Sequence, residues 1–196
     1  MIKALASVLA ALILTGCAAK AFYTFEGARY EDEESFQAAV DMRRTAIVNN
    51  IKPLPSPVTD KKLIVAFASE AAIYQENLRR HQVQNGQPAT GVALEQYRNL
   101  TKSNYKMVRS LFESIEKRGI YKEVIYRDMP TLVIAIEPSS DADALFFTES
   151  GPGAGQYFYS SVKHGKQVFA FDRSAPTTEA RTDAFIQAVQ AMAIRN

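Results

Sequence analysis

The chain has 196 residues, 23 Lys and Arg against 21 Asp and Glu, a formal net charge of +2, two His and one Cys. This near-neutral balance excludes the strongly basic class, so we expect no nucleic-acid partner. Two His and one thiol are too few for a typical zinc site, and we expect neither metal nor cofactor. The length suits one domain whose core must be stable without a disulfide.

The first sixteen residues have the pattern of a secretory signal. Lys3 precedes an apolar run over residues 4–14. This run is shorter than the roughly 20 residues that a membrane-spanning helix needs, so we expect it to be recognised and removed. Because Lys3 is the one charged residue of segment 1–16, removal leaves 180 residues with 22 basic and 21 acidic groups.

Leu14-Thr15-Gly16-Cys17 resembles the lipobox of bacterial lipoproteins. The resemblance implies cleavage after Gly16 and acylation of Cys17, and two or more acyl chains hold a protein firmly on a membrane. Ala18, where inner-membrane lipoproteins of this family carry Asp, implies an outer-membrane anchor facing the periplasm. Cleavage elsewhere, for example near Ala19, and a buried structural Cys17 are the alternative interpretations.

Residues 17–57 are predicted to form a lipidated tether, a helix and a connector. The helix opens at Glu31–Ser35, and its apolar residues Phe36, Val40, Ile47 and Ile51 share one side. The acidic opening suits the helix dipole, although a cation site is the alternative. Pro53–Pro57 ends the helix and favours an extended spacer, so the folded domain should begin near Lys61.

Residues 58–196 have the pattern of a periplasmic α/β domain. The predicted elements are a strand over 62–67, a helix from the Ser69 cap to Arg80, a long helix over 90–118 ended by Gly119, strands over 123–126, 131–136 and 144–148, a hairpin over 156–172 turning at His164-Gly165, and a helix from Thr177 or Thr178. Segment 131–136 could instead belong to a short helix. On the long helix we place Leu94, Tyr97, Leu100, Val108, Leu111, Phe112 and Ile115 toward the core.

We therefore predict an α/β (α+β) fold: a single compact domain with a mostly antiparallel sheet, packed by one long and one C-terminal helix and preceded by an N-terminal helix. Over roughly residues 60–195 this order resembles the periplasmic domains of the LpoB and CsgG lipoprotein families. The resemblance rests on a strand after a Pro-rich segment, a long helix ending in Arg118-Gly119, strand 124–126, segment 141–147, the hairpin and the last helix.

Two regions are candidates for function. Asp141 and Asp143, near Glu137 and Glu149, could bind a cation or cleave a glycan, although Ser and Asp are also ordinary loop residues. The alternation in the hairpin places Tyr157 and Tyr159 on one face, which could be a partner surface; ordinary sheet packing is the alternative.

Other signals for chemistry are weak. The loop over 151–155 is rich in glycine but lacks the spacing of a phosphate-binding loop. His81 and His164 stand far apart in the sequence, and no catalytic motif surrounds them. We therefore expect no enzyme, but a lipid-anchored accessory or partner-binding module of a secretion, pilus or cell-wall assembly complex. The alternative is a periplasmic hydrolase or glycan-binding protein that uses Asp141 and Asp143.

Overall fold

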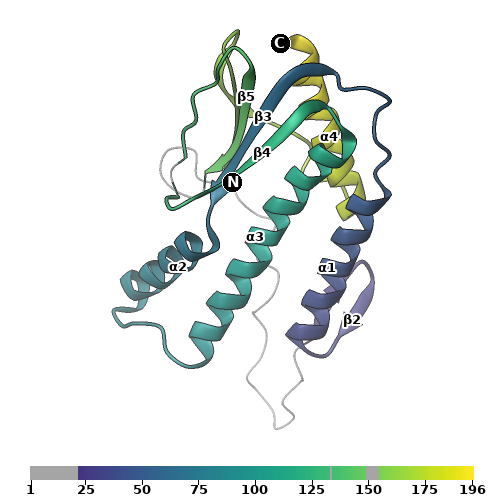
Figure 1. Ribbon diagram of the computed structural model, residues 1–196. Coiled ribbons are helices and arrows are strands. Elements are labelled where there is room, and N and C mark those ends of the chain that lie inside the picture. The colour runs from purple at the N-terminus through teal and green to yellow at the C-terminus, as the bar shows by residue number, and fades with distance from the viewer. Residues whose placement is uncertain (1–21, 133, 149–154) are drawn as a thin grey trace.

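The computed structural model describes residues 22–132, 134–148 and 155–196 (Figure 1). The expected signal segment, Gly16 and Cys17 lie outside the described residues, and so do Glu149 and residues 151–154 of the glycine-rich loop. Within the described part the predicted α/β fold is confirmed. A mixed sheet packs against helices, with one helix before it and one at the C-terminal end.

The elements run in the order β1 (Tyr23–Phe25), β2 (Ala28–Tyr30), α1 (Glu33–Asn50), β3 (Thr59–Ala68), α2 (Glu70–Asn85), α3 (Val92–Arg118), β4 (Tyr121–Met129), β5 (Ala142–Thr148), β6 (Gln156–Ser161), β7 (Gly165–Phe169) and α4 (Thr178–Arg195). The five-stranded sheet has the order β4-β3-β5-β6-β7. Strand β3 is parallel to β4 and β5, whereas β5, β6 and β7 are antiparallel. With the separate β1–β2 hairpin, antiparallel pairings outnumber parallel ones.

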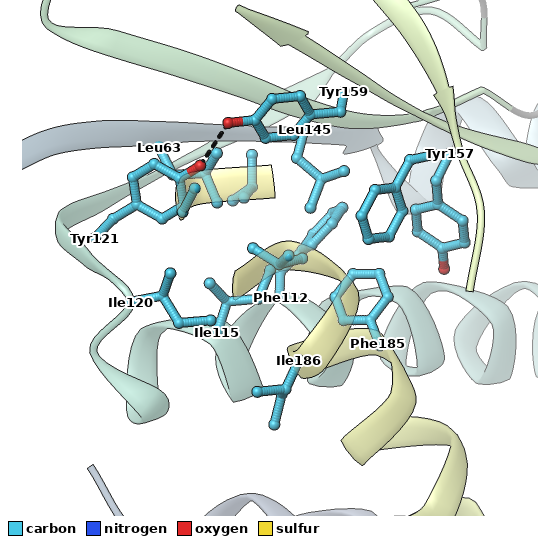
Figure 2. Packing of buried hydrophobic residues seen from close by; sticks show 14 of the residues in the cluster. Leu63, Phe112, Ile115, Ile120, Tyr121, Leu145, Tyr157, Tyr159, Phe185 and Ile186 are labelled. Atoms are coloured by element: carbon cyan, nitrogen blue, oxygen red, sulfur yellow. Dashed lines mark hydrogen bonds between the residues drawn. The ribbon is translucent and has the colours of Figure 1, made fainter. Parts of the chain in front are cut away.

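The main core lies between the sheet and the two helices α3 and α4. Phe112 of α3 and Phe185 of α4 are fully buried, and their rings lie 6.2 Å apart. Leu63 and Leu145, from neighbouring strands, close the cluster from the sheet side (Figure 2). Burial of this much apolar surface is the main stabilising contribution to the fold.

The other face of the sheet is covered by the segment between β4 and β5, and the strand predicted over 131–136 is wrong. The described residues of that segment form no strand or helix, yet Ile134 and Ile136 are buried against Phe146 and Phe158. The physical reason is topological. Because β3 lies between β4 and β5, the chain must cross the sheet face to reach β5, where its side chains can pack but its backbone cannot join the ladder.

Helix α1 belongs to the folded domain, so the predicted start near Lys61 is wrong. Val40 and Ile47 are buried, and Arg43 forms a 3.1 Å ion pair with Glu179 of α4. The β1–β2 hairpin packs on the same helix, with the Tyr23 ring 5.2 Å from that of Phe36. The apolar side of α1 needs a partner surface, and α3 and α4 provide it.

The Pro-rich segment is also attached to the domain. The Leu54 backbone N–H donates to the carbonyl of Arg118 at 2.9 Å, and the Leu54 side chain packs on the main core. The segment forms no helix or strand and bends at Pro55 and Ser56, and these contacts show that it is no free spacer. Any tether is therefore shorter than residues 17–57.

Candidate functional site

The carboxylate of Asp143 lies inside the protein, in the second residue of β5. Its side chain is fully buried, and Nζ of Lys61 on β3 lies 3.1 Å from Oδ1. The hydroxyls of Tyr159 and Tyr121 donate to Oδ2 at 2.6 and 3.3 Å. A carboxylate removed from water needs a paired cation and hydrogen bonds to offset its lost hydration, and these three groups supply them.

The two tyrosines extend this arrangement into a buried network, which we call the Asp143 network: Lys61, Tyr121, Asp143, Tyr159, Ser161 and Asn196. The Tyr121 and Tyr159 hydroxyls lie 2.7 Å apart (Figure 2). Asn196 donates to the Tyr159 oxygen at 2.7 Å and accepts from Ser161 at 2.9 Å. Burial raises the pKa of both tyrosines above the ordinary value of 10.0. Both tyrosine hydroxyls therefore keep their protons and remain hydrogen-bond donors. The network as a whole connects β3, β4, β5 and β6 to the end of α4.

Asp141 is in a different environment from Asp143, two residues away. It lies in an exposed turn, where Ser139 Oγ donates to Oδ1 at 2.6 Å and this hydrogen bond lowers the pKa of Asp141. Cleavage of a glycan by two carboxylates requires both to flank one bond, about 5 to 9 Å apart. A fully enclosed Asp143 cannot flank a substrate. The geometry does not assemble the predicted pair, and exposed Glu137 does not complete it.

The two histidines are held in separate places. His81 Nδ1 on α2 lies 3.1 Å from the Tyr97 hydroxyl, and His164 Nε2 lies 3.4 Å from the carbonyl oxygen of Arg195. Within the described ranges, no group of three or more His, Cys, Asp or Glu is placed to hold a metal ion.

The predicted partner surface at Tyr157 and Tyr159 is wrong. Both side chains point to the helix layer and are buried, with the Tyr157 ring 5.5 Å from that of Phe185 (Figure 2). On the opposite face of β6, Phe158 stacks on Phe146 with a centroid distance of 5.6 Å. Both faces are covered because the segment between β4 and β5 lies on the side that the sequence had left open. Ordinary sheet packing, the alternative interpretation, is confirmed.

Helix α2 and the N-terminal half of α3 form a helical hairpin that extends beyond the strands (Figure 1). Ser69 caps α2 by accepting the N–H of Ala72, and Gly86 ends it with φ +69°. Between the helices, Asn77 Nδ2 donates to the hydroxyl of buried Thr101 at 3.0 Å. This part of the molecule has two helices but no sheet to cover it.

The outward face of α3 therefore carries exposed apolar side chains. Val92, Leu100 and Met107 are 75%, 48% and 39% exposed. At 3.6 residues per turn they share one side of the helix with Gln96 and Ser103, and we call these five residues the α3 stripe. The predicted core position of Leu100 is wrong because α2 covers the neighbouring side of α3, at Tyr97 and Thr101, and the sheet does not reach Leu100.

A charged groove of about 250 Å³ lies beside the C-terminal end of this stripe, between α1 and α3. Lys106 pairs with Asp41, and Arg109 pairs with Glu113, whereas Arg44 has only a 3.7 Å contact with Asp41. Nη1 of Arg44 is the one buried side-chain nitrogen or oxygen without a hydrogen-bond partner in the part of the chain described. Burial lowers the pKa of Arg44, and the groove carries an excess of positive charge.

Among known proteins, no family model, curated protein or solved structure matches this chain. None of the helices in the described ranges is both long and apolar enough to span a bilayer.

Sequence reasoning missed the partners of Asp143. Lys61 and Tyr121 lie 82 and 22 residues away along the chain, and no local pattern connects them. One signal was present. Lys61 alternates with Leu63 and Val65, which places its side chain on the buried face of the strand and implies a buried anionic partner.

Proposed function

We propose that this chain is a lipid-anchored envelope protein that acts without catalysis, as a partner-binding module of a secretion, pilus or cell-wall assembly complex. The observation that carries the proposal is the α3 stripe. Its apolar residues recur after eight and seven positions on one helix face, the spacing with which a helix docks against another helix or into an apolar groove. They lie on a helical hairpin that reaches away from the sheet.

The surroundings of the stripe support a protein partner. Interfaces combine apolar anchors with a polar and charged rim, and the groove lined by Arg44, Lys106 and Arg109 lies beside Met107. Its excess positive charge suits an acidic side chain of the partner, which would give Nη1 of Arg44 the hydrogen-bond acceptor that it lacks. Leu14–Cys17 supports the anchor because of its resemblance to a lipobox.

The hydrolase or glycan-binding alternative has less support. It requires Asp141 and Asp143 to act together, and Asp143 is enclosed by Lys61 and two tyrosines. We therefore place the function of this chain on the helices and not on the aspartates.

A photo-crosslinking residue at Leu100, in the full chain in its native cell, tests the proposal. We expect a discrete adduct with one envelope protein, which the charge-introducing variant Met107→Glu weakens. Val168, 59% exposed on β7, is the matched control position, and Val168→Glu is the matched variant. Equal adducts at both positions, or an adduct at Leu100 that Met107→Glu at normal abundance leaves unchanged, would contradict the proposal.

The anchor is tested separately. Intact mass of the mature protein should show a di- or triacylated N-terminal Cys17, and Cys17→Ser should leave an unlipidated precursor. A mature protein without lipid would overturn the anchor while leaving the helical surface to be judged by cross-linking.

A further inference from the structure

Strand β4 forms one edge of the five-stranded sheet. Within the described ranges, its outer side pairs with no other strand. The strand is nine residues long, and Val124, Ile125 and Tyr126 in its middle are only half-buried. An unpaired edge offers a row of backbone N–H and C=O groups to a further strand.

The charges of β4 are arranged symmetrically about Ile125. Glu123 lies two residues before it and Arg127 two residues after it, while Lys122 and Asp128 lie three residues before and after it. All four side chains are exposed. Each charge thus has an opposite charge at the same distance on the other side of the centre.

This order is complementary to itself. In an antiparallel pair of two copies centred on Ile125, Glu123 of one copy lies opposite Arg127 of the other, and Lys122 opposite Asp128. If one strand slides by one residue in either direction, Lys122 lies opposite Arg127 or Glu123 lies opposite Asp128. Like charges that face each other in this way are destabilising. The register centred on Ile125 is the one in which all four charges lie opposite a charge of the other sign, so the charges favour it.

We propose that β4 pairs with β4 of a second copy of this chain, antiparallel about Ile125, so that two five-stranded sheets become one continuous sheet. This surface is separate from the α3 stripe, and the proposal does not depend on partner binding there. The occupant is inferred from charge complementarity together with the free edge.

The residues involved are available for this contact. Arg127 forms no side-chain hydrogen bond or ion pair with the described residues, so its charge is not neutralised within the fold. Glu123 lies 3.3 Å from Lys62 in an exposed pair, and such pairs contribute little to stability. Asp128 accepts one hydrogen bond, from Tyr105 at 3.0 Å, which leaves its second oxygen free for Lys122 of the other copy.

Charged side chains on an edge strand often serve to prevent pairing. A strand guarded by one sign of charge repels its own copy, whereas this strand attracts it in the register above. A single strand pair buries less surface than the roughly 1,600 Å² of a standard interface. We therefore expect association that is reversible and depends on concentration.

Disulfide trapping tests the register directly. In the full chain with Cys17→Ser, the variant Ile125→Cys supplies the one thiol. Directly opposite residues of antiparallel strands have Cα atoms about 4.5 to 5.5 Å apart, within the range of about 4.4 to 6.8 Å that a disulfide accepts. We expect rapid formation of a covalent dimer under mild oxidation. Arg127→Cys should cross-link slowly, because the two copies of residue 127 are four residues out of register, and Val168→Cys on the opposite edge should also be slow.

Charge reversal tests the chemistry of the contact. Sedimentation velocity over a concentration series should show a monomer–dimer equilibrium for the full chain with Cys17→Ser. Arg127→Glu should weaken it by about tenfold, since two like-charge pairs replace two attractive ones. The double variant Glu123→Arg/Arg127→Glu restores opposite charges and should recover the original equilibrium. Unchanged melting temperatures exclude misfolding as the cause.

Three results would overturn the proposal: a wild-type chain that stays monomeric at every concentration, a double reversal that fails to rescue, or Ile125→Cys cross-linking no faster than Val168→Cys. Partner capture by Leu100 is unaffected by any of them, so the two proposals fail independently.

Discussion

The Asp143 network and the α2–α3 helical hairpin hold polar groups in opposite ways. In the network a buried carboxylate and two buried phenols share hydrogen bonds, and the carboxylate pairs with Lys61, whose side chain is 22% exposed. In the hairpin the ionic contacts are local: Glu76 receives hydrogen bonds from Arg79 and Arg80 within one helix, at the surface. Removing an ionic partner should therefore have different consequences in the two regions, because water can replace a lost bond to the exposed arginines of the hairpin but not a lost bond to buried Asp143.

The difference follows from what covers each region. Asp143 lies where strands β3, β4, β5 and β6 and the end of α4 meet, so every neighbour is protein. The hairpin has no sheet against it, and its ion pairs lie near solvent. Stability is expected to be unequal along the chain, with the network opening only on global unfolding and the hairpin opening locally.

The largest effect is expected for Asp143→Ala. It leaves the buried Tyr159 hydroxyl without its carboxylate acceptor and removes the partner of Lys61, whose side chain is 22% exposed, so we expect a cost of about 3 kcal/mol. Chemical denaturation measures the free energy of unfolding. Asp141→Ala is the matched control, two residues away and exposed, and should change stability by no more than about 0.5 kcal/mol. Equal effects of the two substitutions would contradict the assignment of Asp143 to the core.

The next largest effect is expected at alkaline pH, which should destabilise the Asp143 network. The pKa values of Tyr121 and Tyr159 are raised by burial, so the folded state favours their neutral forms. The contribution of the two neutral tyrosines to the free energy of unfolding is fully present below their unfolded pKa of about 10. It is lost as pH rises further, by about 1.4 kcal/mol per pH unit for each tyrosine. Tyrosinate absorbance should therefore appear together with the loss of circular dichroism. Tyr159→Phe should remove one phenol from this dependence, and a pH profile identical to that of the wild type would contradict it.

In the hairpin, Asn77→Ala should have an intermediate effect. It removes the hydrogen bond to Thr101, whose side chain is buried, at a cost of about 1 kcal/mol. Hydrogen exchange should show faster opening of α2, with little change in the amides of β3 and β5. Uniform acceleration across the sheet would mean that the hairpin and the sheet unfold as one unit.

The smallest effect is expected for Glu76→Gln. Hydrogen bonds from Arg79 hold the pKa of Glu76 down at about 2. The contribution of ionised Glu76 to the free energy of unfolding is therefore present above its unfolded pKa of about 4.5 and is lost as pH falls toward 2. Because the pair is solvated, the loss should stay below about 1 kcal/mol. Stability measured at pH 7 and pH 3 should differ less for the variant than for the wild type. If Glu76→Gln lowered the free energy of unfolding at pH 7 by more than Asn77→Ala does, the expected order of the two effects would be reversed.

Local chemistry in the sequence determined several helix ends, although the β1–β2 hairpin was not predicted. Ser69 and Thr177 are N-caps because their hydroxyls accept a backbone N–H at the start of a helix. Gly119 ends α3 because it adopts φ +70° without strain. The short apolar runs within β3 and β5 were also sufficient to identify both strands. These features depend on neighbours a few residues apart, which is why they could be predicted.

Tertiary structure alone decided which faces are covered. Segment 131–136 has the pattern of a strand, but its described residues lie across the sheet, because no edge next to β5 was free. Tyr157 and Tyr159 are buried because that segment covers the other face of β6, and Leu100 is exposed because the sheet ends before it reaches that turn of α3. The environments of Asp141 and Asp143 differ for the same reason: Lys61 and Tyr121 approach only Asp143. Burial depends on residues distant in sequence, and the periodicity of one segment does not show what will pack against it.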